Sequence, residues 1–325
     1  MAYTKAVLNR ARERLADENR KKHAEYESHL AAAYALRPRL REIDRSLRRI
    51  SAQAAMACFM TGEDTAKTIQ QLKQESLRLQ DERQWILDEA ELADDYLDDT
   101  PVCTVCGGTG YVGTEMCECL HELCRQEQKR ALSPLLSTGR ERFENFNLDY
   151  YPDRYYPAIG TTARALMQKN LNVCRRFAHD FKPGAKSLLF SGATGLGKTF
   201  LSGCIARQVA DSGHSVVYTS ASQLFADYEA VRFDRAEPES VRKYELCDLL
   251  IIDDLGTELT TAFVQSALYQ IVNTRLMTGK KTVISTNLSP GELGRRYGAA
   301  TLSRLEGEYR ILPFFGEDIR KLKRR

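Results

Sequence analysis

Residues 187–199 constrain this chain more than any other stretch, because they combine a strand, a glycine-rich loop and a Lys-Thr pair. Residues 188–190 are apolar and predict a buried strand, and residues 192–199 then read G-x-x-x-x-G-K-T. An apolar helical pattern follows at 200–209. Strand, loop and helix in this order form the context of a phosphate-binding P-loop. The alternative, a glycine-rich turn without function, would leave the Lys-Thr pair and the flanking elements unexplained.

Each part of this loop has a predicted task at a bound nucleotide. The glycines let backbone N–H groups turn toward phosphate oxygens, and the start of the following helix adds its positive dipole end. Lys198 is expected to reach the β- and γ-phosphates, and the Thr199 hydroxyl to ligate Mg²⁺. The predicted nucleotide-binding residues are Gly192, Ala193, Thr194, Gly195, Leu196, Gly197, Lys198 and Thr199, joined by Asp253 from a later strand.

Paired acidic residues end a second apolar strand. Residues 249–252 are Leu-Leu-Ile-Ile, and Asp253 and Asp254 follow directly. Two adjacent carboxylates at the end of a buried strand are costly without a cationic partner. This is the Walker B form, so Asp253 is predicted to hold Mg²⁺, often through water, and Asp254 to orient the attacking water. Asn287 follows another strand and is expected to lie near the γ-phosphate or that water.

Strands and helices alternate around these motifs, as expected of an α/β fold. The sequence predicts further strands at 215–218, 282–286 and 311–315, and helices at 161–181 and 221–233. An aromatic segment at 142–153 is predicted either to cover an adenine or to pack in the core. Basic residues follow the helix at 221–233, and they form either a nucleic-acid contact or a solvated face. These residues are Arg232, Arg235, Arg242 and Lys243.

Nine cysteines, several of them close together, indicate a reducing compartment and a bound metal rather than disulfides. A C-x-x-C pair followed by glycine and a nearby C-x-C pair can complete a tetrahedron around Zn²⁺. The predicted ligands are Cys103, Cys106, Cys117 and Cys119. His121 or Cys124 is an alternative to Cys119, because C-x-C is a tighter spacing. A redox C-x-x-C would need a βαβ pattern that is not seen around it. No vacant coordination site is indicated, so we expect a structural metal, with zinc predicted and iron the open alternative.

The first hundred residues are predicted to form a helical arm. Residues 1–36 lack Gly and Pro and read as one helix, and Pro38 marks a break. A heptad seam then runs through Leu36, Leu40, Ile43, Leu47, Ile50, Ala54 and Ala57, and a second stripe through Ile69, Leu72, Leu79, Ile86 and Ala93. With a turn at 61–64, the two stripes predict a helical hairpin that also offers a face to a partner protein. Contact of the basic first helix with nucleic acid is the other option.

Overall composition says little about function and bears mainly on where in the cell the protein is found. The net charge of +3 does not by itself argue for nucleic acid. No apolar run is long enough to span a bilayer, and the amino terminus lacks the apolar core of a secretion signal. We therefore expect a cytoplasmic protein with no membrane partner.

Taken together, the motifs resemble the DnaC/DnaI group of AAA+ helicase loaders and the related IstB-type ATPases. The segments that carry this resemblance are 143–146, 192–199, 249–256, 285–293, 302–305 and 315–320. It covers about residues 140–321, and the cysteine region is similar to zinc-bearing regions of DnaI-like members. The resemblance implies an AAA+ P-loop NTPase domain at 129–325, with a parallel sheet between helices and no carboxyl-terminal helical lid. A helical arm at 1–98 and a zinc module at 99–128 precede it.

The resemblance also assigns roles to residues outside the two nucleotide motifs. It makes Asn287 the sensor-1 residue, Arg304 the arginine finger offered to a neighbouring subunit, and Arg320 a sensor-2-like arginine. A finger supplied in trans is worth about 10³–10⁵ in rate, so a lone subunit is expected to hydrolyse ATP slowly. Two positions depart from the pattern. Asp254 stands where many AAA+ enzymes have Glu, and 298–300 read Gly-Ala-Ala where members often have Gly-Glu-Arg, which leaves Arg295 and Arg296 as alternative fingers.

The function implied by the resemblance is ATP-dependent loading of a DnaB-type hexameric replicative helicase onto single-stranded DNA, with ATP and ADP as a slow switch. ATP, Mg²⁺ and Zn²⁺ are the expected cofactors, and a homo-oligomer through Arg304 is expected. An IstB-like transposition helper that assembles on duplex DNA is the alternative within the family. A non-hydrolysing nucleotide-dependent adaptor is the alternative outside it, although the intact Lys198, Thr199, Asp253 and Asp254 argue against that reading.

Overall fold

The computed structural model describes residues 3–57, 63–93, 95–132, 140–182 and 184–322. The chain separates into two compact units, one of residues 13–119 and one of residues 1–12 with 120–325. This grouping is not the same as the three predicted segments, whose boundaries at 98 and 128 stay a prediction.

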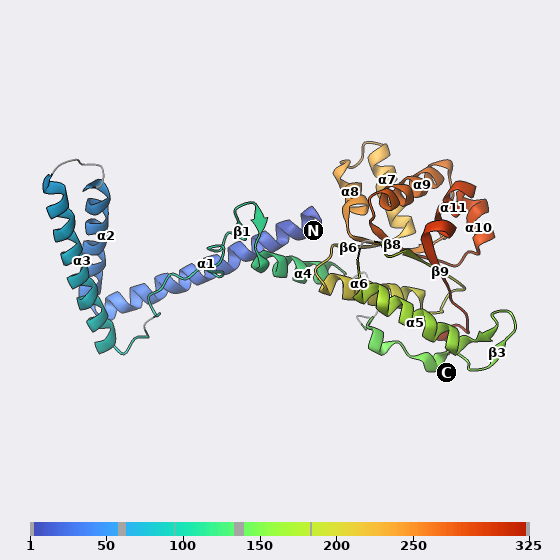
Figure 1. Cartoon of the computed structure of the whole chain (residues 1–325), viewed down its shortest axis with the longest axis horizontal. Coiled ribbons are helices and arrows are strands. Elements are labelled where there is room, and N and C mark those ends of the chain that lie inside the picture. Colours follow the sequence, from blue (N-terminus) through green and yellow to red (C-terminus); the bar gives the residue numbers. More distant parts are fainter. Residues whose placement is uncertain (1–2, 58–62, 94, 133–139, 183, 323–325) are drawn as a thin grey trace. The chain divides into compact units, whose positions relative to one another are not determined.

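Three long helices dominate the unit of residues 13–119. They are α1 (Lys5–Leu36), whose first turns belong to the other unit, α2 (Pro38–Ala57) and α3 (Glu63–Glu89). Helices α2 and α3 lie side by side (Figure 1), and ion pairs of Arg39 with Glu82 at 2.8 Å and of Asp44 with Arg83 at 3.0 Å join them. Pro38 occupies the first position of α2, where its missing N–H has no partner to lose.

The predicted apolar seam is largely the core of this helical pair. Its buried members are Leu40, Ile43, Ile50, Ala57, Leu79 and Ile86, and Leu47 and Leu72 are partly buried against them. Leu36 and Ile69 were also predicted for the seam, but both are exposed. Ala93 was predicted for it too, but it lies beyond the end of α3 and is exposed. Of the predicted turn, residues 63–64 already belong to α3, and residues 61–62 lie outside the described ranges.

A short antiparallel hairpin of β1 (Tyr111–Val112) and β2 (Glu115–Met116) follows the arm. It leads directly into α4 (Glu118–Leu132), which begins in one unit and continues in the other.

Five parallel strands form the sheet of the other unit, in the order β6, β7, β8, β5, β9. Their bounds are β5 (Ser187–Ser191), β6 (Val216–Ser220), β7 (Leu249–Leu255), β8 (Lys281–Thr286) and β9 (Tyr309–Pro313). Strand β8 therefore lies between the strand of the P-loop and the strand of the paired acids. Because all strands are parallel, their carboxyl ends meet at one edge of the sheet, where ligands bind in open α/β folds.

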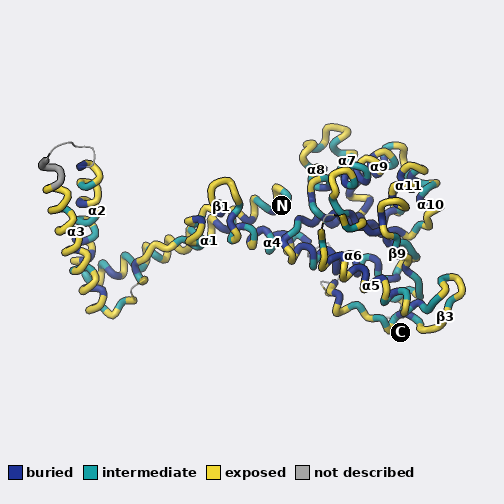
Figure 2. Tube along the Cα trace, viewed as in Figure 1, coloured by how far each residue is buried: buried dark blue, intermediate teal, exposed yellow. Residues whose placement is uncertain are grey.

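Helices cover both faces of this sheet (Figure 1). Helices α5 (Ala163–His179) and α6 (Lys198–Asp211) pack on one face, together with Leu188 and Phe190. The other face, which includes Leu189, carries α7 (Ala221–Arg232), α8 (Glu239–Leu246), α9 (Ala262–Met277), α10 (Pro290–Tyr297) and α11 (Ala299–Glu308). The buried strands are visible between the helix layers (Figure 2). A strand buried on both faces reads as a continuous apolar run, which is why β5 and β7 were predictable.

Smaller elements complete the unit. The 3₁₀ turns η2 (Phe143–Asn145) and η3 (Leu148–Tyr150) precede a hairpin of β3 (Tyr155–Tyr156) and β4 (Thr161–Thr162), and α12 (Ile319–Leu322) follows β9. The predicted α/β fold, with a parallel sheet between helices preceded by a helical region and a cysteine cluster, is confirmed. Within the described ranges, no helix combines the length and apolar character needed to cross a lipid bilayer.

Candidate nucleotide and metal sites

Two glycines shape the loop between β5 and α6. Gly192 has a φ of 152°, and a Cβ atom there would fall on the carbonyl oxygen of Phe314. Gly197 caps α6 in the left-handed region with a φ of 86°, and a Cβ atom there would approach the Tyr151 hydroxyl to 2.9 Å. Only glycine fits such a backbone without strain. The two glycines therefore let Phe314 and Tyr151 pack directly against the loop while its backbone keeps the tight curve that a P-loop requires.

Lys198 lies inside this loop. Its ammonium donates to the carbonyl oxygens of Gly192 and Ala193, both at 2.7 Å, and the residue is only 6% exposed. Burial lowers the pKa of Lys198, while the carboxylates of Asp254 and Asp253 counteract that shift. The cation is therefore held at the loop, close to two carboxylates.

A cavity of about 270 Å³ opens beside the loop. From the loop side it is lined by Thr194, Gly195, Leu196, Gly197, Lys198, Thr199 and Phe200. Asp254, Thr257, Asn287, Ile319 and Arg320 also line it. The structure thus gathers the predicted phosphate-binding, water-orienting and sensing side chains around one space.

The aromatic segment forms another wall of this cavity. Phe146 stacks on Tyr151 at 5.7 Å between ring centroids and approaches Phe200 at 6.0 Å. Tyr151 is fully buried and donates its hydroxyl to the Leu196 carbonyl at 2.9 Å, which ties the segment to the P-loop. Phe143 instead packs in the core. Core packing of the segment is therefore confirmed, while Phe146 lines the cavity and its covering of an adenine stays a prediction.

The paired acids have separate positions because β7 is bulged between them. Its register against β8 shifts between Ile252 and Leu255, and Asp254 has a φ of 54°. A bulge re-aims the side chain that it carries. Asp254 accordingly lines the cavity, and burial together with the charge of Asp253 raises its pKa.

Asp253 lies deeper, at 7% exposure, with both carboxylate oxygens engaged. Tyr218 donates to Oδ2 at 2.8 Å, and Ser285 donates to Oδ1. Burial, followed by the Asp253 charge, raises the pKa of Tyr218, so its hydroxyl remains a donor. Neither Tyr218 nor Ser285 belonged to the predicted site. Their signal in the sequence is weak, because each is one of several polar residues in its strand.

The predicted arginines differ in location. Arg320 lines the cavity, because the backbone N–H of Ile319 donates to the Gly195 carbonyl at 3.0 Å and anchors α12 at the P-loop. Arg304 is exposed on α11 and does not line this cavity. The alternative finger Arg296 donates to the Glu258 carbonyl on the same unit.

These residues fit ATP with Mg²⁺. The cradle excludes any side chain at Gly192, the ammonium of Lys198 is directed into the loop, and Thr199 supplies a hydroxyl at the cavity wall. Oxygen donors of this kind are the ligands that Mg²⁺ prefers. Thr199 and Asp253 remain the predicted magnesium residues.

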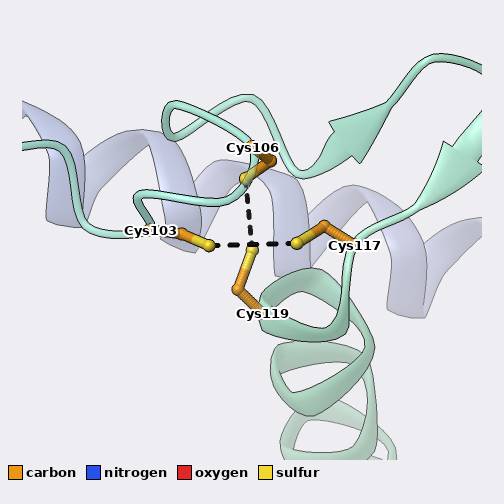
Figure 3. Close-up of side chains that lie close together, drawn as sticks. All are labelled: Cys103, Cys106, Cys117 and Cys119. Atoms are coloured by element: carbon orange, nitrogen blue, oxygen red, sulfur yellow. Dashed lines mark hydrogen bonds between the residues drawn. The ribbon is translucent and has the colours of Figure 1, made fainter.

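The four predicted cysteines come together in the unit of residues 13–119. Their sulfur atoms all lie within 4.8 Å of one another and point toward a common centre (Figure 3). The Cys103 and Cys117 sulfurs are 3.8 Å apart, and those of Cys106 and Cys119 are 3.5 Å apart. Zn–S bonds of about 2.3 Å place the sulfurs of a tetrahedron about 3.8 Å apart. The donor set therefore fits Zn²⁺.

Local donors support thiolate formation in this cluster. Burial opposes ionisation of Cys106, but hydrogen bonds led by the Gly110 N–H, at 3.2 Å, lower its pKa to about 6. Asn19 on α1 accepts from the Val102 N–H at 3.3 Å and donates to the Gly108 carbonyl at 2.9 Å, so it supports the loop from outside. Such outer contacts orient the ligands of a metal site.

The fourth position of the cluster is occupied by Cys119, in the first turn of α4. The alternatives are placed differently. His121 lies with its ring 5.9 Å from that of Tyr3, and Cys124 is fully buried, with burial raising its pKa to about 11.

Comparison with known proteins places this chain in a family. A family model described as "IstB-like ATP binding protein" matches residues 161–325, which is half of the chain. This chain belongs to the family of IstB-like ATP-binding proteins. The predicted resemblance to the DnaC/DnaI and IstB group is confirmed.

Individual relatives of this IstB-like protein are distant. A putative ATP-binding protein in an insertion sequence of Mycobacterium tuberculosis is 29% identical over 105 residues, 32% of this chain and 42% of the relative. The replicative helicase loader DnaC of Escherichia coli is 26% identical over 137 residues, 42% of this chain and 56% of the relative. The chain thus spans about half the length of these relatives.

Solved structures show weaker likeness. A crystal structure of the DnaC helicase loader aligns with a TM-score of 0.45 at 22% identity, over 53% of this chain and 98% of that one. A structure of DnaI gives a TM-score of 0.45 at 19% identity, over 57% of this chain and 92% of that one. The fold of the IstB-like protein therefore rests on its own sheet order and loop geometry.

Proposed function

We propose that this chain is an ATP-dependent loader of a DnaB-type hexameric helicase onto single-stranded DNA, acting as a slow ATP/ADP switch. The observation that carries the proposal is a cavity that gathers Lys198, Thr199, Asp254 and Asn287 in an IstB-like ATP-binding domain, on a chain that also has a separate helical and cysteine-bearing unit. The helicase loader DnaC among its relatives supports this reading.

The residues around the cavity suit slow ATP hydrolysis. Lys198 neutralises phosphate charge, Asp254 orients the attacking water, and Asn287 and Arg320 contact the γ-phosphate region. Bound Mg²⁺ would neutralise charge that develops on the transferred phosphate. Asp254 has a shorter reach than Glu, and Arg304 lies on an exposed helix. A finger supplied by a neighbouring copy would complete the site, so hydrolysis would depend on assembly.

A basic and aromatic patch after α7 supports the contact with single-stranded DNA. Phe233 is 59% exposed, and the guanidinium of Arg235 lies 5.5 Å from its ring. Arg232 lies 4.9 Å from the ring of Phe263. Stacking of a base on an exposed ring beside cationic groups is typical of single-strand binding. By contrast, Arg242 and Lys243 pair with Glu239 and Asp227 on the same unit.

The helical pair supports the contact with a partner protein. Met56 on α2 and Leu77 and Trp85 on α3 are exposed at 70%, 50% and 63%. Exposed large apolar side chains, and Trp above all, are enriched where proteins bind one another. We assign helicase binding to the exposed apolar residues of this helical pair.

The second candidate is a transposition helper that assembles on duplex DNA. The description of the family and the relative from an insertion sequence favour it. A non-hydrolysing adaptor is less well supported, because the cavity retains Lys198, Thr199 and Asp254 together.

Mixing experiments distinguish these functions. The full chain would be combined with the purified DnaB-type helicase of the same organism and a single-stranded oligonucleotide, and complex masses measured by mass photometry. We expect a helicase complex with ATP that ADP weakens. The Lys198→Ala variant should lose this nucleotide dependence, and Lys169→Ala, an exposed lysine on α5, should keep it. A complex with an insertion-sequence transposase on duplex DNA, and none with helicase, would select the helper function.

The arginine finger has its own test. Arg304→Ala should leave ATP binding unchanged and lower the ATPase rate of the assembled protein by about 10³-fold, since the finger acts on a neighbour's phosphate. The concentration dependence of the ATPase rate would be measured beside the Arg295→Ala variant. An unchanged rate for Arg304→Ala with a loss for Arg295→Ala would move the finger to Arg295.

A further inference from the structure

The carboxylate of Asp253 accepts hydrogen bonds from the two strands that flank β7. Tyr218 comes from β6 and Ser285 from β8, the two neighbours of β7 in the sheet. Each hydroxyl donates to a different oxygen of the carboxylate, Tyr218 at 2.8 Å to Oδ2 and Ser285 to Oδ1. Tyr218 is 7% exposed and Ser285 is fully buried, so water does not compete freely for these bonds.

Ser285 also holds the backbone of Asp254, the second acid of the pair. Its hydroxyl oxygen accepts the backbone N–H of Asp254 at 2.9 Å. A hydroxyl offers one donor and two acceptor positions, so a single side chain can orient the Asp253 carboxylate and fix the peptide of the bulge at the same time. Tyr218, in contrast, acts on Asp253 alone.

We infer that Tyr218 and Ser285 are positioning residues that hold Asp253 for the magnesium ion of a bound nucleotide; this rests on the proposed ATP site. A carboxylate has about four lone-pair directions, and two donors leave two of them for the ion or its water. Pinning both oxygens stops the carboxylate from rotating. The magnesium site is therefore set before nucleotide arrives, as outer-shell partners do for other metal ligands.

Magnesium dependence separates this role from simple packing. Affinity for a fluorescent ATP analogue would be measured in EDTA and across a Mg²⁺ titration. Tyr218→Phe keeps the ring, so its affinity in EDTA should equal that of wild type. The Mg²⁺ concentration that gives half of the full increase in analogue affinity should rise about 10–100-fold. This is the usual loss of metal affinity when an outer-shell partner is removed.

Two further variants complete the test. Tyr228→Phe removes another, partly buried, hydroxyl that donates to a carboxylate, Glu245, and should titrate like wild type. Ser285→Ala should shift the Mg²⁺ curve as Tyr218→Phe does and also lower the ATPase rate at saturating Mg²⁺, because it releases Asp254.

The outcomes are distinct. Identical Mg²⁺ curves for wild type and Tyr218→Phe would overturn the inference while leaving the ATP site intact. Equal weakening of Tyr218→Phe with and without Mg²⁺ would reassign Tyr218 to packing. A wild-type protein that binds no nucleotide in either condition would overturn the ATP site and this inference with it.

Discussion

The P-loop and the cysteine cluster are both glycine-containing turns that lead into a helix, yet they are held in different ways. Leu188 to Phe190, before the P-loop, are at most 1% exposed and packed on both faces of the sheet. Around the cysteines, Val105 and Val112 are 74% and 51% exposed. The surrounding core therefore fixes the first site, whereas the second has little core around it and is predicted to depend on a bound metal. If so, one glycine-containing turn is specified by packing and the other by its ligand.

Metal removal should give the largest difference between the two sites. Structural zinc contributes on the order of 10 kcal/mol to folding in small modules, so a strong chelator or Cys106→Ser should unfold the segment around β1 and β2. Hydrogen exchange would show lost amide protection there, and elemental analysis the lost zinc. ATP affinity should stay within about twofold, because packing holds the P-loop. Protected amides after complete zinc removal would contradict the comparison.

Removal of the Lys198 ammonium should affect the nucleotide site and leave the cysteine cluster unchanged. Lys198→Ala deletes charge-assisted hydrogen bonds to phosphate, each worth about 1.5–3 kcal/mol, so ATP affinity should fall at least roughly 100-fold. Isothermal titration would measure this beside Lys169→Ala, which should bind as wild type does. Zinc content should be the same in all three proteins. Undiminished ATP affinity of Lys198→Ala would remove the P-loop assignment.

A matched pair of glycine substitutions should give the smallest effects and sharpen the comparison. Gly192→Ala places a Cβ atom against Phe314 at a backbone conformation tolerated mainly by glycine, and should destabilise its unit by about 3 kcal/mol. Gly113 between β1 and β2 has a φ of 60° and open space around it, so Gly113→Ala should cost only about 1 kcal/mol. Urea unfolding followed by local hydrogen exchange would measure both. Equal losses would mean that packing does not distinguish the two turns.

Features with a local pattern were predictable from the sequence. The strand predicted at 188–190 is β5 (Ser187–Ser191), and the helix predicted at 200–209 is α6 (Lys198–Asp211). A continuous apolar run, a glycine loop and an apolar helix leave few other interpretations. The cysteine spacing likewise led to the four thiols that the structure brings together, although it left the fourth position open.

Features that depend on contacts between distant segments were not predictable. Helix α8 (Glu239–Leu246) was not predicted, and its Arg242 and Lys243 were placed in or near a basic loop. Arg242 pairs with Glu239 in the same helix, but the pairing of Lys243 with Asp227 on α7 depends on the fold. The different depths of Asp253 and Asp254 follow from a bulge defined by pairing with β8. Tyr218 reaches Asp253 only because the sheet makes β6 and β7 neighbours, and spacing in the sequence does not show that pairing.

Helicase loading on a closed DNA circle tests the central claim most directly. The substrate is a circle of single-stranded DNA coated with single-strand-binding protein, to which a tailed strand is annealed. The circle offers the purified hexameric helicase no free end, so release of the annealed strand reports loading. We predict release only with the full chain and ATP, with Lys169→Ala active and Lys198→Ala inactive. Helicase activity that is the same without the chain, or with Lys198→Ala in its place, would contradict nucleotide-controlled loading.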